Sequence, residues 1–248
     1  MEVIVVGASG TFPRANGACN GYLVRHGRSN ILLDIGTGVL SSLYNYISPG
    51  DLDALIITHL HPDHFLDIYP YRYYLEFCAA DKLPLKVYAP AGAAARIKPL
   101  FNETDPAKFD KVFHFIDIGE VGVFQVGELS VCGREVLHLE PTYGISVAAE
   151  GRRLFYTSDT AFDERLLDYA KDVDLLLAET TFMAAQDGIP VPHMTTVEVG
   201  ALAVKANVGR LLLTHLWPHS DREQILAEVT AGFDGKIDLA DEGLVVRV

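Results

Sequence analysis

The sequence predicts an α/β fold of four layers, an α/β/β/α sandwich in which two mixed sheets pack face to face and helices cover their outer surfaces. Apolar runs of strand length alternate with segments of helical periodicity along most of the chain, and residues 118–156 have almost only strand character. In addition, 248 residues with 49% hydrophobic side chains can bury a large core. We therefore expect a single domain over residues 1–248, either one unit or two fused halves that share a core.

Strand and helix patterns follow one another without a linker or low-complexity stretch. Strand-like apolar runs occupy residues 3–6, 22–24, 31–35, 55–57, 85–88, 113–116, 121–126, 129–137, 145–148, 154–156, 175–177, 211–213 and 244–248. Helical periodicity occupies residues 39–47, 65–78, 91–100, 164–170, 195–206 and 221–230. The fifth helix also has a start signal, because Thr195-Thr196-Val197-Glu198 matches a capping box.

The most specific motif is Thr58-His59-Leu60-His61-Pro62-Asp63-His64, which directly follows an apolar strand. It places three imidazoles and one carboxylate on a short loop, and these are donors that divalent ions such as Zn²⁺ accept. Four potential donors exceed the three protein ligands that a single catalytic zinc usually has. The motif therefore predicts a site for two metal ions.

Three further polar residues each follow the end of a predicted strand: His138, Asp159 and His215. Loops supported by a rigid sheet often carry functional side chains, so we expect these residues to share one edge of the fold with the motif. Each of them could instead be a solvated turn residue. Their occurrence together with the motif favours a common site.

Eight motifs are spread over nearly the whole chain, namely Gly7-Ala8-Ser9-Gly10, Asp34-Ile35-Gly36-Thr37-Gly38, the segment from Thr58 to His64, His138, Ser158-Asp159-Thr160, Ala178-Glu179-Thr180-Thr181-Phe182, His193-Met194-Thr195 and Thr214-His215-Leu216. In these motifs the chain resembles the metallo-β-lactamase fold superfamily, and within it the branch of ribonuclease Z and related phosphodiesterases. The motif from Thr58 to His64 marks the superfamily. Glu179 and His193-x-Thr195 point to the phosphodiesterase branch.

This resemblance implies a centre of two divalent metal ions with seven ligands. One ion would be held by His59, His61 and His138, the other by Asp63, His64 and His215, with Asp159 and a hydroxide between them. Zinc is the expected metal, and manganese or iron would suit the same donors. Asp34 is expected to orient a metal-bound imidazole or to brace a turn rather than to bind metal itself.

The catalytic residues are predicted to be Asp63, His193 and Glu179. Two metal ions can activate water and polarise a phosphoryl oxygen, but the leaving alkoxide still needs a proton. His193 can supply it near neutral pH if Glu179 holds its ring and raises its basicity, and the resemblance implies the same pair. The alternative is that His193 only precedes the capped helix at residues 195–206. Both descriptions can hold together, because the cap would fix His193 beside the site.

Composition predicts a cytoplasmic enzyme. The apolar run after Met1 is short and ends at Gly7, so it is a first strand rather than a signal peptide. No run approaches the roughly 18 apolar residues that a membrane span requires. The odd count of three cysteines, Cys19, Cys78 and Cys132, and the lack of CxxC spacing predict small buried side chains in a reducing compartment.

The predicted substrate is a small phosphodiester, such as a cyclic nucleotide or a short nucleotide product. Ribonuclease Z grips precursor tRNA with a basic arm inserted between the positions that match His138 and Asp159, whereas residues 139–158 here have room only for a turn and two strands. The net charge of −13, from 20 basic and 33 acidic residues, also opposes binding of long nucleic acid. We expect no membrane partner, and a homodimer is an open alternative to a monomer.

Three other functions stay open. A tRNA 3′-processing endoribonuclease without the arm would need a partner subunit to grip RNA. A lactonase or thioesterase would use the same metals but would not need His193 as an acid. A metal-bound binding module would normally lack a ligand, whereas this chain keeps all seven. The sequence contains neither GxxxxGK nor GxSxG, so nucleoside triphosphatase and serine hydrolase functions lack support.

Overall fold

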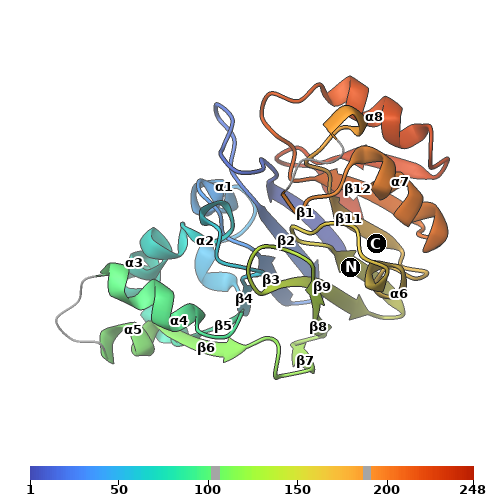
Figure 1. Cartoon of the computed structure of the whole chain (residues 1–248). Helices are drawn as coiled ribbons and strands as arrows, with labels where there is room; N and C mark the ends of the chain where they lie inside the picture. The colour runs from blue at the N-terminus through green and yellow to red at the C-terminus, as the bar shows by residue number, and fades with distance from the viewer. Residues whose placement is uncertain (102–106, 187–190) are drawn as a thin grey trace.

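The computed structural model describes residues 1–101, 107–186 and 191–248, in which two sheets of seven strands pack against each other (Figure 1). The first sheet has the spatial order β14 (Val245–Arg247), β1 (Glu2–Gly7), β2 (Gly21–His26), β3 (Ser29–Leu33), β4 (Ala54–Ile56), β5 (Leu85–Ala89) and β6 (Phe113–Asp117). The second has the order β13 (Lys236–Leu239), β12 (Arg210–Thr214), β11 (Leu175–Glu179), β10 (Arg152–Tyr156), β9 (Thr142–Ala149), β8 (Leu129–Val136) and β7 (Val123–Val126).

Both sheets are mixed, and they follow one plan. In the first sheet the pairs from β14 to β3 are antiparallel, and the pairs from β3 to β6 are parallel. In the second sheet the pairs from β7 to β10 are antiparallel, and those from β10 to β13 are parallel. Each half of the chain therefore builds one sheet, except that the last strand, β14, joins the first sheet.

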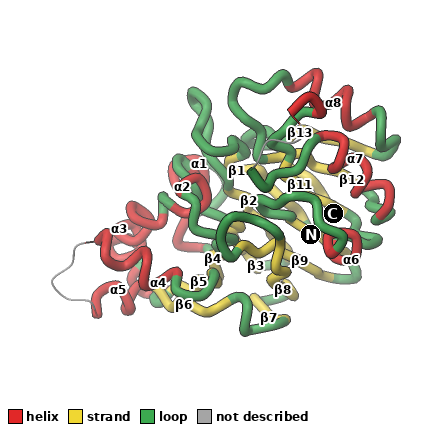
Figure 2. The backbone as a smooth tube through the Cα atoms, viewed as in Figure 1, coloured by secondary structure: helices red, strands yellow, loops and turns green. Residues whose placement is uncertain are grey.

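Helices cover the two outer faces (Figure 2). The first sheet is covered by α1 (Val39–Leu43), α2 (Pro62–Phe65), α3 (Ile68–Cys78), α4 (Ala93–Ile97) and α5 (Ala107–Val112). The second sheet is covered by α6 (Arg165–Tyr169), α7 (Thr196–Lys205) and α8 (Arg222–Thr230). Short 3₁₀ turns lie at Pro49–Asp51, Ala80–Lys82, Lys98–Phe101 and Ala184–Gln186. In the part of the chain described, no helix is long and apolar enough to cross a membrane.

Three apolar cores separate the four layers. One lies between the sheets, and one lies under the helices on each side. Strand β1 shows how the sequence produces this arrangement, because Val3 and Val5 enter the central core while Ile4 and Val6 enter the core under the helices. Strands buried on both faces appear in sequence as continuous apolar runs. The predicted four-layer fold is confirmed.

The helix boundaries differ from the predicted ones where backbone groups find other partners. The pattern at residues 65–78 is divided into α2 and α3, because the Asp63 carbonyl accepts from Asn20 N–H and Asp67 N–H donates to Ile35. The pattern at residues 91–100 leaves the α-conformation after Ile97, where Pro99 lacks a backbone N–H. Helix α5 and strand β13 were not predicted, and both are short and partly exposed.

The prediction that all three cysteines are buried is wrong for Cys78. Cys19 and Cys132 are buried, whereas Cys78 ends α3 and is exposed. All three thiols are free. Apolar patterning placed Cys78 on a helix, but it could not show that this end of the helix projects beyond the core.

Candidate metal centre

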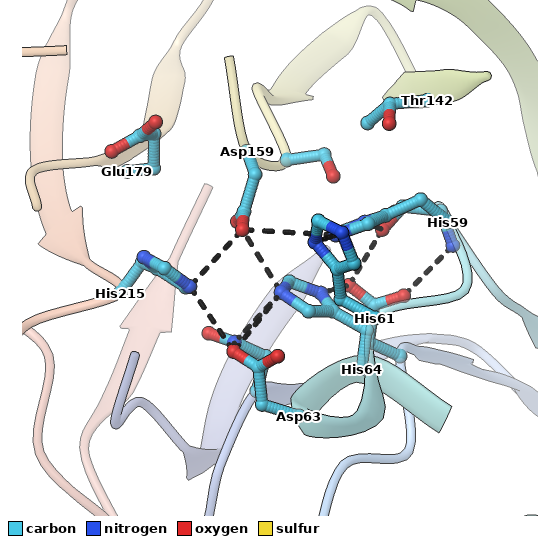
Figure 3. A network of polar contacts seen from close by, with 12 residues as sticks. His59, His61, Asp63, His64, Thr142, Asp159, Glu179 and His215 are labelled. Carbon is cyan, nitrogen blue, oxygen red and sulfur yellow. Dashed lines mark hydrogen bonds and ion pairs between the residues drawn. The ribbon is translucent and has the colours of Figure 1, made fainter. Parts of the chain in front are cut away.

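The seven predicted ligands come together in the structure, and six of them, all except His138, are labelled in Figure 3. The loop after β4 carries His59 and His61, and the first turn of α2 carries Asp63 and His64. The other three follow strands of the second sheet: His138 after β8, Asp159 after β10 and His215 directly after β12. Their donor atoms form two clusters that share Asp159.

The first cluster consists of His59, His61, His138 and Asp159. His61 Nδ1 lies 3.1 Å from His59 Nε2 and 3.2 Å from His138 Nε2. Asp159 Oδ2 is 3.7 Å from His59 Nε2. One nitrogen of His61 therefore lies at hydrogen-bond distance from one nitrogen of each of the other two imidazoles.

Neighbouring groups fix two of these imidazoles with their lone pairs toward the cluster. The Thr58 hydroxyl donates its one proton to Asp34 Oδ2 at 3.0 Å, so at 3.1 Å it accepts from His59 Nδ1–H. His138 Nδ1–H donates to the Pro192 carbonyl at 3.0 Å. The Nε2 atoms of both rings are then acceptors that point at one place, which is the arrangement that a cation stabilises.

The second cluster consists of Asp63, His64, Asp159 and His215. His215 Nε2 lies 3.3 Å from Asp63 Oδ2 and 3.2 Å from Asp159 Oδ2. His64 Nε2 lies 3.5 Å from Asp63 Oδ2 and 3.3 Å from Asp159 Oδ1. Asp159 Oδ1 is buried, and within the described part of the chain no contact to it has hydrogen-bond geometry, although His64 Nε2 lies 3.3 Å away. A buried carboxylate oxygen with unused acceptor capacity fits a metal-binding role.

Hydrogen bonds behind the second cluster orient its imidazoles. His64 Nδ1 donates to Asp34 Oδ2 at 2.8 Å. The Thr181 hydroxyl donates to Glu179 Oε2 at 2.7 Å and therefore accepts from His215 Nδ1–H, also at 2.7 Å. Both Nε2 atoms thus face the carboxylates of the cluster. The residues present fit two divalent cations bound by imidazole and carboxylate.

Asp34 braces the metal loop, in agreement with its predicted role. Its buried carboxylate accepts from His64 Nδ1, from both the backbone N–H and the hydroxyl of Thr58, and from the Tyr156 hydroxyl. Its backbone has a φ of 61°, which side-chain-bearing residues seldom adopt. Ser158 and His215 share this left-handed conformation with φ values of 56° and 55°. Such backbone strain often accompanies functional sites.

Burial keeps two imidazoles of the first cluster, those of His59 and His138, neutral. Burial, together with the neighbouring imidazole of His64, holds the pKa of His59 well below its ordinary value. Burial also lowers the pKa of His138. Both rings are therefore unprotonated near neutral pH, which is the form that binds metal.

The second cluster carries charge. Burial alone would lower the pKa of His215, but the carboxylates of Asp159 and Asp63 outweigh it and raise the pKa to about 10. The same carboxylates raise the pKa of His64 well above its ordinary value against the effect of burial. In return, burial would raise the pKa of Asp159, but His215 and His64 hold it well below its usual range. A cation must displace these imidazole protons, so its binding is coupled to proton release.

The predicted acid pair lies beside the second cluster. His193 Nδ1 is 2.9 Å from Glu179 Oε1, and the His193 ring stacks on that of His215 with centroids 5.3 Å apart. The fully buried Glu179 side chain also accepts from the backbone N–H groups of Thr160 and Met194. The predicted capping box of α7 is present at Thr195 and fixes the start of the helix just after His193.

An open cavity of about 490 Å³ exposes the site to solvent. Its polar lining includes His61, Asp63, His138, His193 and His215. Its remaining lining includes Leu139, Phe182, Val191 and Trp217. This volume suits a small-molecule ligand.

Sequence reasoning gave no role to Thr181, Asn20 or Thr11. Thr181 links Glu179 to His215, Asn20 Nδ2 lies 3.0 Å from His64 Nε2, and Thr11 N–H donates to Asp63 Oδ2 at 2.7 Å. Thr181 lies within the motif Ala178-Glu179-Thr180-Thr181-Phe182, so the sequence could have indicated that it belongs to the site. The contacts of Asn20 and Thr11 depend on loop geometry that no local pattern reveals.

Comparison with known proteins agrees with this architecture. Residues 29–216 match the family model described as the beta-lactamase superfamily domain, and the chain belongs to this family. The chain is 30% identical over 251 residues to YhfI of Bacillus subtilis, a protein named as a probable metallo-hydrolase, and the alignment covers 99% of each protein.

The crystal structure of YhfI, described as a metallo-beta-lactamase fold protein, matches the chain with a TM-score of 0.88 and 29% identity. The match covers 99% of this chain and 98% of YhfI. Ribonuclease Z of Salinispora arenicola is 26% identical over 305 residues, which cover 100% of this chain and 96% of that protein. The resemblance predicted from the motifs is confirmed.

Proposed function

We propose that this protein is a metal-dependent hydrolase that cleaves small phosphodiesters with two divalent ions, expected to be zinc. One observation carries the proposal: two donor clusters that share Asp159 lie beside an imidazole, His193, that a buried carboxylate, Glu179, holds in place. Metal ligands alone would suit many hydrolases, but an alkoxide leaving group also needs a proton donor. The relatedness to YhfI and to ribonuclease Z supports the hydrolase class.

Two ions held by the clusters would polarise a phosphoryl oxygen and make hydroxide available near neutral pH. The chain supplies the other half of the reaction. Because His193 Nδ1 is engaged with Glu179 Oε1, the ring offers its Nε2 to the cavity. A proton on Nε2 passes to the leaving oxygen, and the Glu179 carboxylate stabilises the imidazolium before the transfer.

The proposal of a small substrate rests on the chain between His138 and Asp159. It forms only the strands β9 and β10, which are joined by a turn at Glu150 and Gly151. This hairpin offers no arm for RNA, and the net charge of −13 opposes a phosphate backbone at long range. The cavity is of the size that a mononucleotide or a similar diester fills.

The test is an assay of metal-loaded protein against phosphodiesters, lactones, thioesters and precursor tRNA. We expect turnover of cyclic nucleotides and nitrophenyl diesters that exceeds turnover of lactones and thioesters. Preferential lactone or thioester hydrolysis that survives His193→Ala would contradict the proposal. Efficient and accurate 3′ processing of precursor tRNA by the isolated protein at moderate salt would favour the endoribonuclease alternative.

A further inference from the structure

Four apolar side chains form a wall of the cavity beside the metal centre. Leu139, Val191 and Trp217 remain 68%, 38% and 39% exposed, and the fourth, Phe182, is buried. The Trp217 and Phe182 rings meet edge to face with centroids 6.3 Å apart, and Phe182 meets the His193 ring in the same manner at 5.6 Å. The apolar wall therefore runs directly up to the imidazole that faces the leaving group.

The described lining of the cavity contains no Lys or Arg side chain that could pair with a second phosphate group of a substrate. Arg14 and Arg96, which do not line the cavity, pair with acids: Arg14 with Asp241 and Glu242, and Arg96 with Glu140. The wall therefore could not compensate the charge of an additional phosphate.

A diester and a monoester place different demands on such a site. A phosphodiester carries one negative charge, which the metal centre can neutralise, whereas a terminal phosphate adds nearly two more. Placing that charge against apolar surface without a paired donor is unfavourable. An aromatic or apolar ester group would instead be stabilised there by stacking and by burial.

We propose that Leu139, Val191, Trp217 and Phe182 bind an aromatic or apolar ester group of the substrate, so that the enzyme selects singly charged diesters and rejects those with a second phosphate. This inference rests on the proposed function and specifies its substrate class. Trp217 is the main stacking surface, since it is aromatic and exposed. Leu139 and Val191 border the same wall.

Two substrates that release the same nitrophenolate test the wall: bis(p-nitrophenyl) phosphate and methyl p-nitrophenyl phosphate. We expect Trp217→Ala to lower the ratio of their kcat/KM values by about tenfold, mainly by raising KM for the aryl substrate. Trp217→Phe should retain most of the wild-type ratio, and Leu139→Ser should lower it through an independent position. Phe77→Ala is the matched control, because Phe77 is an exposed aromatic residue on α3 that does not line the cavity.

A second pair tests the charge: thymidine 5′-(p-nitrophenyl phosphate) with and without a 3′-phosphate. We expect the 3′-phosphate to lower kcat/KM by about tenfold or more. Two outcomes would overturn this inference alone. In the first, the protein hydrolyses diesters but Trp217→Ala and Leu139→Ser leave the ratio of kcat/KM for the two nitrophenyl substrates unchanged. In the second, the substrates with and without a 3′-phosphate are hydrolysed with equal kcat/KM. Absence of any diester hydrolysis by metal-loaded protein would overturn the proposed function itself.

Discussion

The Thr181 hydroxyl is expected to control metal affinity although it binds no metal. It donates to Glu179 Oε2 and accepts from His215 Nδ1–H, both at 2.7 Å, and the Thr181 side chain is buried. Thr181→Val keeps the shape of the side chain but removes both interactions. His215 would then lose the partner that directs its Nε2 toward Asp63 and Asp159.

The structure allows the size of this effect to be estimated. A buried N–H left without an acceptor costs about 1–3 kcal/mol, and a lost bond to an ionised carboxylate adds about 1.5–3 kcal/mol before relaxation. Because Glu179 keeps the backbone donors of Thr160 and Met194, we expect the free energy of unfolding to fall by about 2–4 kcal/mol. Loss of a partner that orients a metal-bound imidazole typically weakens metal binding by about 10–100-fold.

The assay compares metal affinity, measured by competition with a chromophoric chelator, with stability in urea. Thr181→Ser should restore most of both quantities, because it restores the hydroxyl. Thr180→Val is the matched control: its buried hydroxyl donates only to the Ala178 carbonyl at 3.2 Å, so this variant should lose stability without losing metal affinity. Wild-type metal affinity in Thr181→Val would contradict a role of this hydroxyl in metal binding. So would a loss of metal affinity in Thr181→Ser that is as large as the loss in Thr181→Val.

Three other outcomes are expected. Elemental analysis should find about two metal ions per chain, and Asp63→Ala or His215→Ala should lower this number together with activity; a stoichiometry near one that added metal cannot raise would contradict the two-ion centre. His193→Ala should leave metal content unchanged and slow cleavage of alkyl diesters by about 10²–10⁴-fold, while nitrophenyl diesters lose much less; equal losses would indicate a positioning role. Iodoacetamide at pH 8 should label the exposed Cys78 rapidly and Cys19 very slowly, because burial and the charge of Asp63 raise the pKa of Cys19 to about 12. Mass spectrometry measures the order of labelling, and faster labelling of Cys19 than of Cys78 would contradict this prediction.

The sequence predicted the fold well because strands that are buried on both faces appear in the sequence as continuous apolar runs. It also predicted which residues come together at the candidate metal centre, since residues that directly follow strands lie at a sheet edge. His215 directly follows β12, and Asp159 follows β10. Their convergence is a consequence of the parallel pairing of β10, β11 and β12.

The remaining features depend on side-chain geometry between distant segments. The bond from His138 to the Pro192 carbonyl joins two loops that lie far apart in the sequence, and the apolar wall depends on a contact between the rings of Trp217 and Phe182, which also lie far apart in the sequence. Sequence periodicity indicates which residues of one helix or strand are buried. It does not indicate which side chains of two different segments contact each other. For the same reason, the exposure of Cys78 could not be read from its helical pattern.

The two halves of the site use the same arrangement of a buried carboxylate, a threonine and two histidines. Asp34 accepts directly from His64 and, through the Thr58 hydroxyl, holds His59. Its counterpart in the second half, Glu179, binds one imidazole directly and holds a second one through a threonine hydroxyl in the same way.

In this comparison His193 corresponds to His64, and His215 corresponds to His59. Three of these four imidazoles direct Nε2 at the two donor clusters that share Asp159, whereas His193 belongs to neither of these clusters and lines the cavity. One arrangement, built once in each half of the fold, therefore orients two proposed metal ligands on one side and one proposed metal ligand together with the proposed proton donor on the other. His193 is thus held by the same kind of contact as a proposed ligand, while its ring lines the cavity in which we propose that the substrate binds.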